Sequence, residues 1–449
     1  MSSASPLDAN VDAIARAVRT GHLSAESLAR AALDRIVECD ARIHAIQMTF
    51  ETRALADARR IDETVRAGRN PGPLAGVPFL VKCNFDVAGY TTVAGSPARL
   101  ALPAASADAA LVARLCAAGA VPVGATHMDE LACGATGVNP HFGAVHLPAD
   151  SARMTGGSSS GSAAAVAAGY TPLALGSDTN GSIRAPAALC GVWAVKPSNG
   201  GLEMQGCLPY APSLDVAGGF ARTFADLVAL YDALCGTDRS ARVGNMRAPL
   251  RVAVLTGGFM EFANADARRA VQRAAACFGH VDETAIDEDT LTEIRAASLT
   301  VSNYELARAH RILLDAEPSL VSARLRERIV TGLATADSAY EEALSIRVKW
   351  RARLSALFSP YEVLIAPATP YAAPLFTDTA IEVNGTPLEP AKSLGRLTQP
   401  ISFAALPVVS APCHAGNELP VGVQLIGAKG SEAACFAAGA QIARARGET

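Results

Sequence analysis

The chain has 449 residues, of which half are apolar and 18% are charged, and its formal net charge is −4. This composition excludes an intrinsically disordered protein, and the length allows a substantial hydrophobic core. The slightly acidic balance, without any long basic run, argues against nucleic acid and anionic membranes as partners. The longest uncharged apolar stretch, 161–176, is interrupted by Pro172, so we expect no membrane span.

The ten cysteines are scattered, and no two lie closer than 17 residues apart. This spacing fits neither a metal knuckle nor a disulfide scaffold. Residues 1–10 contain no basic stretch followed by an apolar one, so nothing directs export. We therefore expect a reduced, cytoplasmic protein with no metal and no cofactor. Only five of the 39 basic side chains are lysines, and each one matters because an amine can lose its proton, whereas a guanidinium effectively cannot.

In chain order, the first predicted elements are three amphipathic helices, at 11–19, 24–39 and 53–66, the second with Ser24 as its N-cap. An apolar run at 77–81 then predicts a buried strand that leads directly into Lys82. After it, helices and strands alternate, which predicts an α/β layer with helices over a largely buried sheet. The alternating helix and strand pairs are 108–118 with 120–124, 160–168 with 173–176, and 182–189 with 192–195.

The second half of the chain is mostly helical before strands return. From about 264 to 358, helical spacing and rising charge density predict a helical insertion or cover. Strands are predicted again at 363–366, 408–411 and 421–426. No internal repeat and no convincing linker divides the sequence, so we expect one large domain.

Two Gly/Ser-rich runs, at 156–162 and 176–182, are the most informative part of the sequence. Such runs are often flexible linkers, but here apolar, element-forming sequence follows closely. A phosphate cradle is one interpretation, although the spacing of a Walker lysine is absent. A hydrolase elbow with Ser159 as nucleophile is a second. It is weakened because the mostly polar residues 151–155 predict no strand to feed that turn.

A third interpretation places the nucleophile at Ser182, where a strand passes through a tight turn into a helix. The backbone N–H groups of Thr179, Asn180, Gly181 and Ser182 would then be available to an oxyanion. None of the eight histidines lies in a recognisable triad context, so the base would have to be another group. Lys82 is the candidate, because burial at the end of an apolar strand lowers the pKa of an amine toward neutrality.

Four long segments of the chain resemble the amidase signature hydrolases. They are 73–82, the Gly/Ser run at 156–163, the segment 176–187, which reads Gly-Ser-Asp-Thr-Asn-Gly-Ser-Ile-Arg-x-Pro-Ala, and 419–427. The resemblance covers nearly the whole chain. It implies an α/β fold in which a single domain, 1–449, is built on a central mixed, twisted sheet with helices on both faces. The core motifs would lie at 73–200 and 360–430.

Matched residue by residue, the resemblance implies a Ser-Ser-Lys triad. Lys82 becomes the base, Ser158 the bridging serine held by a cis peptide bond, and Ser182 the nucleophile that accepts the acyl group. Neutral Lys82 would take a proton through Ser158 from Ser182, and the same relay would return it to the leaving ammonia or amine. Water would then hydrolyse the acyl-enzyme. The residues expected to support these loops are Ser159 and the ion pair of Asp178 with Arg184.

Within the family, Asn180 in place of the usual glycine resembles the AtzE-type amidohydrolases, whose namesake hydrolyses carboxybiuret in cyanuric acid degradation. This implies hydrolysis of a small urea-like or carboxylated amide with release of ammonia. It also implies homodimerisation and a small helical accessory subunit, which together would give a hetero-oligomer. Gln399 and Ser402 are candidate substrate contacts, although both could equally satisfy buried backbone groups.

Several positions depart from that group's usual sequence. Cys83 and Asn84 follow the base, Ser160 replaces a common glycine, and 146–148 and 200–201 also differ. These departures leave the triad intact but bear on substrate recognition. Two alternatives therefore stay open, a glutaminase subunit of an amidotransferase-like complex and a catalytically idle subunit. An idle subunit would be expected to have lost at least one triad residue.

Overall fold

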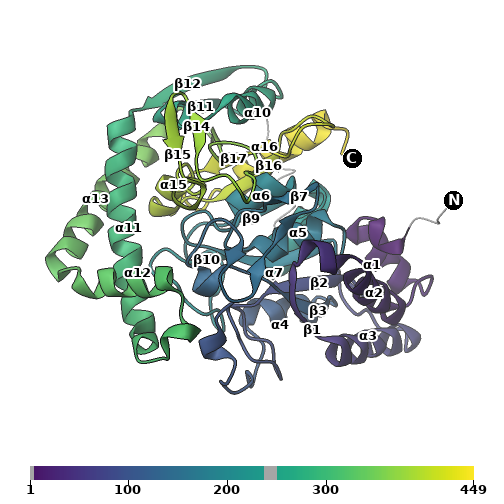
Figure 1. The fold of residues 1–449 in the computed structure, drawn as a ribbon. Helices are drawn as coiled ribbons and strands as arrows, with labels where there is room; N and C mark the ends of the chain where they lie inside the picture. Colours follow the sequence, from purple (N-terminus) through teal and green to yellow (C-terminus); the bar gives the residue numbers. More distant parts are fainter. Residues whose placement is uncertain (1–4, 237–249, 449) are drawn as a thin grey trace.

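The computed structural model describes residues 5–236 and 250–448, and one large β-sheet runs through the middle of the molecule (Figure 1). Over these residues the sheet has 11 strands in the order β1-β3-β2-β8-β10-β9-β16-β17-β13-β11-β12. The strands are β1 (Ile46–Thr49), β2 (Pro78–Lys82), β3 (Val121–Thr126), β8 (Leu173–Asp178), β9 (Trp193–Lys196), β10 (Val216–Ala221), β11 (Val252–Gly257), β12 (Val281–Ile286), β13 (Val363–Pro367), β16 (Val408–Pro412) and β17 (Gly422–Gly427).

The sheet is mixed, as the family resemblance implies. Strand β2 runs parallel to β3 and β8, whereas the strands from β8 through β10, β9, β16 and β17 to β13 are joined by antiparallel pairings. Parallel pairing resumes from β13 through β11 to β12. The predicted fold class, an α/β domain on one large mixed sheet, is therefore confirmed.

Helices cover both faces of the sheet. A Cβ atom added at Gly218 of β10 would lie 3.0 Å from Ile183, whereas one added at the next residue, Gly219, would lie 2.6 Å from Leu230 of α7. Because successive residues of a strand face opposite sides, these two contacts belong to opposite layers. The helices near the sheet are α1 (Val11–Arg19), α2 (Ala25–Ile43), α3 (Glu51–Arg66), α4 (Ala110–Ala117), α5 (Ser160–Ala167), α6 (Arg184–Cys190), α7 (Phe224–Cys235), α9 (Gly258–Glu261), α10 (Ala265–Ala275), α15 (Gln399–Phe403) and α16 (Glu432–Ala445).

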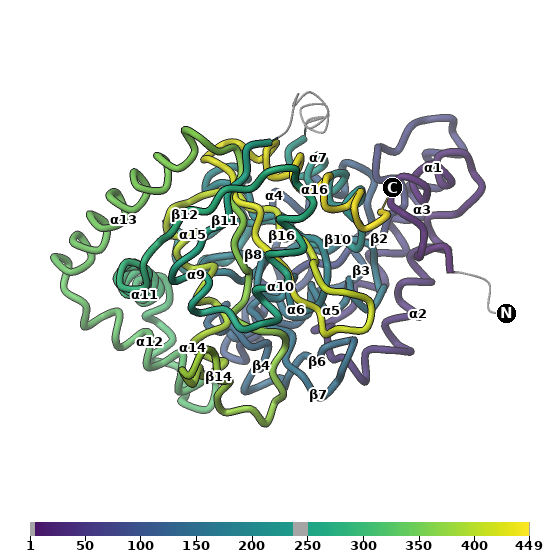
Figure 2. The backbone as a smooth tube through the Cα atoms, turned by 90° about the horizontal axis from the view of Figure 1, so that it is seen from above, coloured from purple at the N-terminus to yellow at the C-terminus, as the bar shows by residue number. Residues whose placement is uncertain are grey.

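Three long helices form a lobe at one side of the molecule. They are α11 (Glu288–His310), α12 (Ala323–Ala334) and α13 (Asp337–Leu357). Both views place this lobe opposite the N-terminal helices α1 to α3 (Figures 1 and 2). Helix α11 packs against α12 and α13 within the lobe and against α15, which joins the lobe to the segment before β16. Among the described helices, none combines the length and apolar character needed to cross a membrane.

The predicted elements are present, with shifted ends. The Ser24 hydroxyl caps α2, as expected, by accepting from the backbone of Ser27. The stretch 264–358 is not helical throughout, because it contains β12. This strand lies at the edge of the sheet and is partly exposed, so it carries polar and charged residues that resemble a helix surface in sequence. Strands β1, β10 and β11 were not predicted. Strand β10 contains Gly218 and Gly219, and glycine has low strand propensity.

Candidate active site

Lys82 is the last residue of β2, and its side chain is fully buried. The run of apolar residues before it places the amine inside the α/β layer. Desolvation lowers the pKa of Lys82 to about 8, and the buried Asp129 and Asp178 only partly oppose this effect. The amine Nζ donates a hydrogen bond of 2.8 Å to Ser158 Oγ. A substantial neutral fraction near pH 8 makes this lysine suitable as a base.

Ser158 lies in the loop before α5, and the Gly157–Ser158 peptide bond is cis, as the family resemblance implies. Glycine is required at the preceding position, because a Cβ atom at Gly157 would lie 1.9 Å from Oδ2 of the buried Asp129. The next residue, Ser159, ties this loop to two neighbours. Its hydroxyl donates to the carbonyl of Ser177 at 3.1 Å, and its N–H donates to the carbonyl of Ser182 at 3.2 Å.

The turn after β8 is organised by the carboxylate of Asp178. It accepts hydrogen bonds from the backbone N–H groups of Gly181 (2.8 Å) and Ile183 (3.1 Å), and it forms two 3.0 Å contacts with the Arg184 guanidinium. Burial alone would raise the pKa of Asp178, but the Arg184 pair holds it well below its usual value. Arg184 is anchored in turn by Gln424 at 2.7 Å. The pair therefore fixes the backbone that presents Ser182.

The hydrogen bond from Gly181 to Asp178 changes the expected oxyanion site. Because a carboxylate already accepts the Gly181 N–H, this group is not available as predicted. The sequence did carry a signal for it, since an Asp side chain commonly caps the backbone of its own turn. Among the described hydrogen bonds, none is donated by the backbone N–H of Thr179, Asn180 or Ser182. These three groups remain candidates to bind an oxyanion.

The Ser182 hydroxyl lines a cavity and forms no hydrogen bond among the described residues. The predicted hydrogen bond between Ser158 Oγ and Ser182 Oγ is therefore not formed in this structure. A serine side chain has three staggered rotamers, and catalytic hydrogen bonds in unliganded enzymes often tighten only when substrate binds. The structure thus contains the Lys82–Ser158 hydrogen bond that the expected relay requires, and Ser182 lines the cavity.

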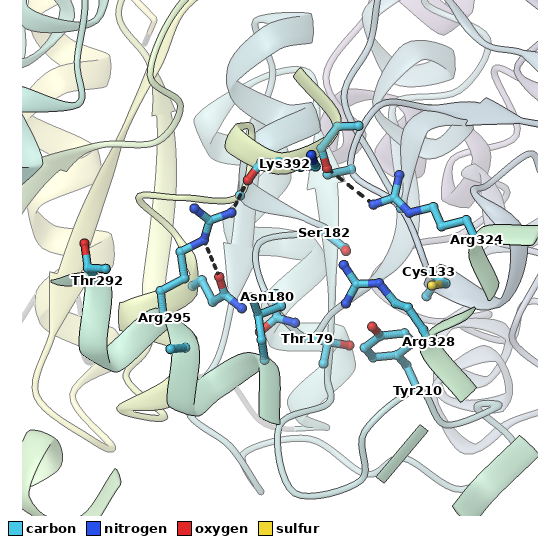
Figure 3. A pocket seen from close by; sticks show the side chains of 18 residues that line it. Cys133, Thr179, Asn180, Ser182, Tyr210, Thr292, Arg295, Arg324, Arg328 and Lys392 are labelled. Carbon is cyan, nitrogen blue, oxygen red and sulfur yellow. Dashed lines mark hydrogen bonds between the residues drawn. The ribbon is translucent and has the colours of Figure 1, made fainter. Parts of the chain in front are cut away.

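The cavity beside Ser182 has a volume of about 500 Å³, in the range of small-ligand sites. Three arginines from the helical lobe line it. Arg295 comes from α11, and Arg324 and Arg328 are four residues apart on α12, so they lie on one face of that helix. Figure 3 shows Arg295 on one side of the turn that carries Asn180 and Ser182, and Arg324 and Arg328 on the other. Among the described residues, no Asp or Glu lines the cavity.

The three arginines differ in how they are held. Arg295 donates to Gln399 Oε1 at 3.2 Å and to the carbonyl of Lys392 in α14 (Pro390–Ser393). Arg324 donates to a neighbouring carbonyl of the same segment. Arg328 donates to Asn303 at 3.0 Å. These acceptors are neutral, and among the described residues none of the three arginines forms an ion pair. The side chains that line the cavity therefore carry net positive charge.

The structure separates the two predicted substrate contacts. Gln399 lines the cavity, where its amide oxygen holds Arg295. Ser402 is fully buried behind the turn, where it contacts Arg184 and donates to Asp178 at 3.3 Å. It is therefore placed as support for the ion pair and not beside substrate. The arginines of the cavity were not predicted individually, because an arginine on an amphipathic helix usually faces solvent.

The chain matches the family model described as Amidase over residues 27–436. It is 42% identical over 444 residues to the AtzE subunit of the 1-carboxybiuret hydrolase of Pseudomonas sp. (strain ADP), with 95% of this chain and 96% of that protein covered. It is 32% identical to a subunit of the glutamyl-tRNA(Gln) amidotransferase of Symbiobacterium thermophilum, over 91% of this chain and 90% of that protein.

Solved structures agree with this match. One described as "An unexpected vestigial protein complex reveals the evolutionary origins of an s-triazine catabolic enzyme" superimposes with a TM-score of 0.92 at 39% identity, covering 98% of this chain and 99% of that one. The 6-aminohexanoate cyclic dimer hydrolase with substrate gives a TM-score of 0.85 at 25% identity, covering 98% and 97%. The chain belongs to the amidase signature family and is a hydrolase of amide C–N bonds.

Proposed function

We propose that this chain hydrolyses a small amide that carries a carboxylate, of the carboxybiuret type, and releases ammonia. The observation that carries this proposal is the cavity beside Ser182, which is lined by three arginines and, among the described residues, by no carboxylate. Burial lowers the pKa of Arg295 only to about 10, so this guanidinium stays charged at neutral pH. A carboxylate in this cavity would gain charge-assisted hydrogen bonds in a partly desolvated setting.

The chemistry follows the Lys82, Ser158 and Ser182 relay. Lys82 takes the proton of Ser158 as Ser158 takes the proton of Ser182, whose oxygen attacks the amide carbonyl. Backbone N–H groups of the turn stabilise the oxyanion. The C–N bond then breaks, and the proton returns from Lys82 through Ser158 to the leaving nitrogen. Water hydrolyses the resulting acyl-enzyme by the same relay, which frees Ser182 and the acid product.

A glutaminase is the runner-up, since the glutamyl-tRNA(Gln) amidotransferase includes a relative of this chain. Glutamine carries an ammonium as well as a carboxylate, so its site needs an anionic or strongly accepting group for the ammonium. The described lining offers arginines and Lys392 instead, which repel it. An idle subunit is disfavoured because Lys82, Ser158 and Ser182 are all retained. The cavity charge thus favours an anionic substrate without a second, positive group.

We also propose that this chain works with a small helical subunit and that two copies join into a hetero-oligomer. The support comes from the solved relative, which is described as a protein complex, and from the coverage of nearly the full length of both chains. Sedimentation of the chain with and without the accessory subunit of a carboxybiuret hydrolase tests this assembly. A chain that stays a monomer under both conditions would contradict it.

The substrate proposal is tested by comparing amides that differ in charge. Ammonia release is measured from carboxybiuret, from biuret, which lacks the carboxylate, and from glutamine. We expect kcat/KM for carboxybiuret to exceed that for biuret by about 10- to 150-fold, which corresponds to one hydrogen bond to a charged group. Replacement of Arg328 by Met should remove most of this preference, because it takes one guanidinium group away from the cavity lining. Equal rates for both amides, or faster hydrolysis of glutamine, would overturn the proposal.

A further inference from the structure

Ser177 lies one residue before the Asp178 turn, on β8, and both of its oxygens approach the amine of Lys82. Its hydroxyl Oγ is 2.9 Å from Nζ, and its carbonyl oxygen is 3.4 Å from Nζ. The third contact of the amine is Ser158 Oγ, at 2.8 Å. The Lys82 amine thus has three oxygen neighbours, two of which belong to Ser177.

Three oxygen contacts suit the amine in both of its protonation states. Neutral Lys82 has two N–H groups and one lone pair, and it acts as a base only if the lone pair faces Ser158. Its two N–H groups then point at the two oxygens of Ser177. Protonated Lys82 has three N–H groups, and all three oxygens accept them. Ser177 therefore satisfies the amine before and after it takes the proton.

Ser177 is itself held from two further directions. The Asn84 amide donates to Ser177 Oγ at 3.1 Å, and the Ser159 hydroxyl donates to the Ser177 carbonyl at 3.1 Å. The backbone of Ser177 is also fixed in the sheet, where it is paired with Ala217 of β10. Ser177 is 5% exposed, so water does not replace these contacts. Its two oxygens are consequently rigid acceptors with a fixed direction.

We propose that Ser177 is a positioning residue of amide hydrolysis, which holds both N–H groups of neutral Lys82 so that the lone pair points at Ser158. The inference rests on the proposed function, because it takes Lys82 as the base. Asn84 contributes indirectly by fixing the Ser177 hydroxyl. Cys83 and Asn84 depart from the usual sequence of AtzE-type amidohydrolases. This departure therefore includes a residue that contacts Ser177, the group that orients the base.

Two variants of Ser177 and one matched control test this role. Ser177→Ala removes one acceptor from the amine, Ser177→Thr keeps the hydroxyl, and Ser162→Ala removes a buried hydroxyl that contacts Thr126 and the Leu175 carbonyl but not Lys82. The pH dependence of kcat and KM is measured for amide hydrolysis by the full chain. Melting temperatures report on folding.

For Ser177→Ala we expect kcat to fall about 10- to 100-fold with KM nearly unchanged, because the base is misdirected while the cavity is untouched. The acidic limb of the kcat profile should also move to lower pH, since the ammonium form loses an acceptor that stabilises it. A purely structural defect would lower kcat at every pH without moving this limb. Ser177→Thr should restore the position of the limb and most of kcat, and Ser162→Ala should keep both.

The outcomes separate this inference from the proposed function. If Ser177→Ala has the same profile as Ser162→Ala, or loses activity without a shift of the limb, the role of Ser177 is overturned while the relay stands. If Lys82→Arg keeps its activity, the base lies elsewhere and the proposed relay fails. A shifted limb with reduced kcat in Ser177→Ala alone, together with rescue by Ser177→Thr, supports both.

Discussion

Lys82 and Lys196 are the two fully buried lysines among the described residues, and they occupy similar places in the sheet. Each ends a strand, β2 or β9, and desolvation lowers the pKa of both amines, to about 8 for Lys82 and about 7 for Lys196. Their partners differ. Lys82 contacts two serine hydroxyls, whereas Lys196 donates to the carbonyls of Pro197 at 2.9 Å and Leu406 at 2.8 Å.

The difference shows that a lowered pKa is not sufficient for catalysis. A carbonyl can only accept a hydrogen bond, so the partners of Lys196 cannot pass a proton to it. A hydroxyl both accepts and donates, so Ser158 can carry a proton between Lys82 and the cavity. By this criterion we assign the proposed chemistry to Lys82, and Lys196 joins β9 to the segment before β16. We therefore expect replacement of Lys82 to affect activity and replacement of Lys196 to affect stability.

The largest effect is expected for Lys82→Arg. The guanidinium preserves the charge but cannot lose its proton, so amide hydrolysis should fall by about 10³-fold or more. Steady-state ammonia release measures the loss, and circular dichroism confirms that the variant folds. A folded variant with activity within tenfold of the wild type would assign the proton transfer to another group.

The pH dependence of kcat/KM should report Lys82 and not Lys196. The base must be neutral, and its pKa is about 8, so activity should fall about tenfold per unit below that pH and level off above it. Lys196→Met should leave this limb in place, even though burial lowers the pKa of Lys196 as well. Loss of the limb in the Lys196 variant would break the distinction between the two lysines.

Lys196→Met should instead lower stability. The change leaves the carbonyls of Pro197 and Leu406 buried without their donor, which should reduce the free energy of unfolding by about 2–3 kcal/mol. Denaturant unfolding measures this loss. The kcat of the folded protein should stay close to that of the wild type, because the partners of Lys196 are outside the proposed relay. Reduced kcat with unchanged stability would place Lys196 in the reaction.

The smallest effect is expected at Ser160, in the first turn of α5. Its hydroxyl is fully buried and has no hydrogen-bond partner among the described residues. Ser160→Ala should therefore raise the free energy of unfolding, by about 1 kcal/mol, because an unsatisfied buried hydroxyl is removed. Its kcat should not change. A destabilised variant would show that the hydroxyl has a partner, such as an ordered water.

Much of the catalytic core could be predicted from local sequence. An apolar run before Lys82 predicts its burial, and the strand, turn and helix around Ser182 predict a serine at a helix start with unpaired backbone N–H groups beside it. These features depend on neighbours in the chain, which periodicity reveals. The bond from Gly181 to Asp178 also has a local signal, in the spacing of an Asp and a Gly within one turn.

The substrate cavity could not be predicted in the same way. Arg295 and Arg328 lie on helices far along the chain from Ser182, and their local sequence is that of ordinary amphipathic helices. Only the packing of α11 and α12 brings them to the nucleophile. The role of Ser177 is equally hidden, because it depends on the direction of two oxygens around one amine. Long-range packing and hydrogen-bond direction are the parts that a single sequence does not report.

The central claim is that Lys82 activates Ser182 as the nucleophile. Its most direct test is labelling with an activated phosphonate ester, followed by peptide mass mapping, in the wild type and in Lys82→Arg. We expect one phosphonate on Ser182 in the wild type, formed at a rate that rises with pH toward about 8, and little labelling in the variant. Labelling of Ser158 or Ser159 instead, or equally fast labelling of Ser182 without Lys82, would contradict the account.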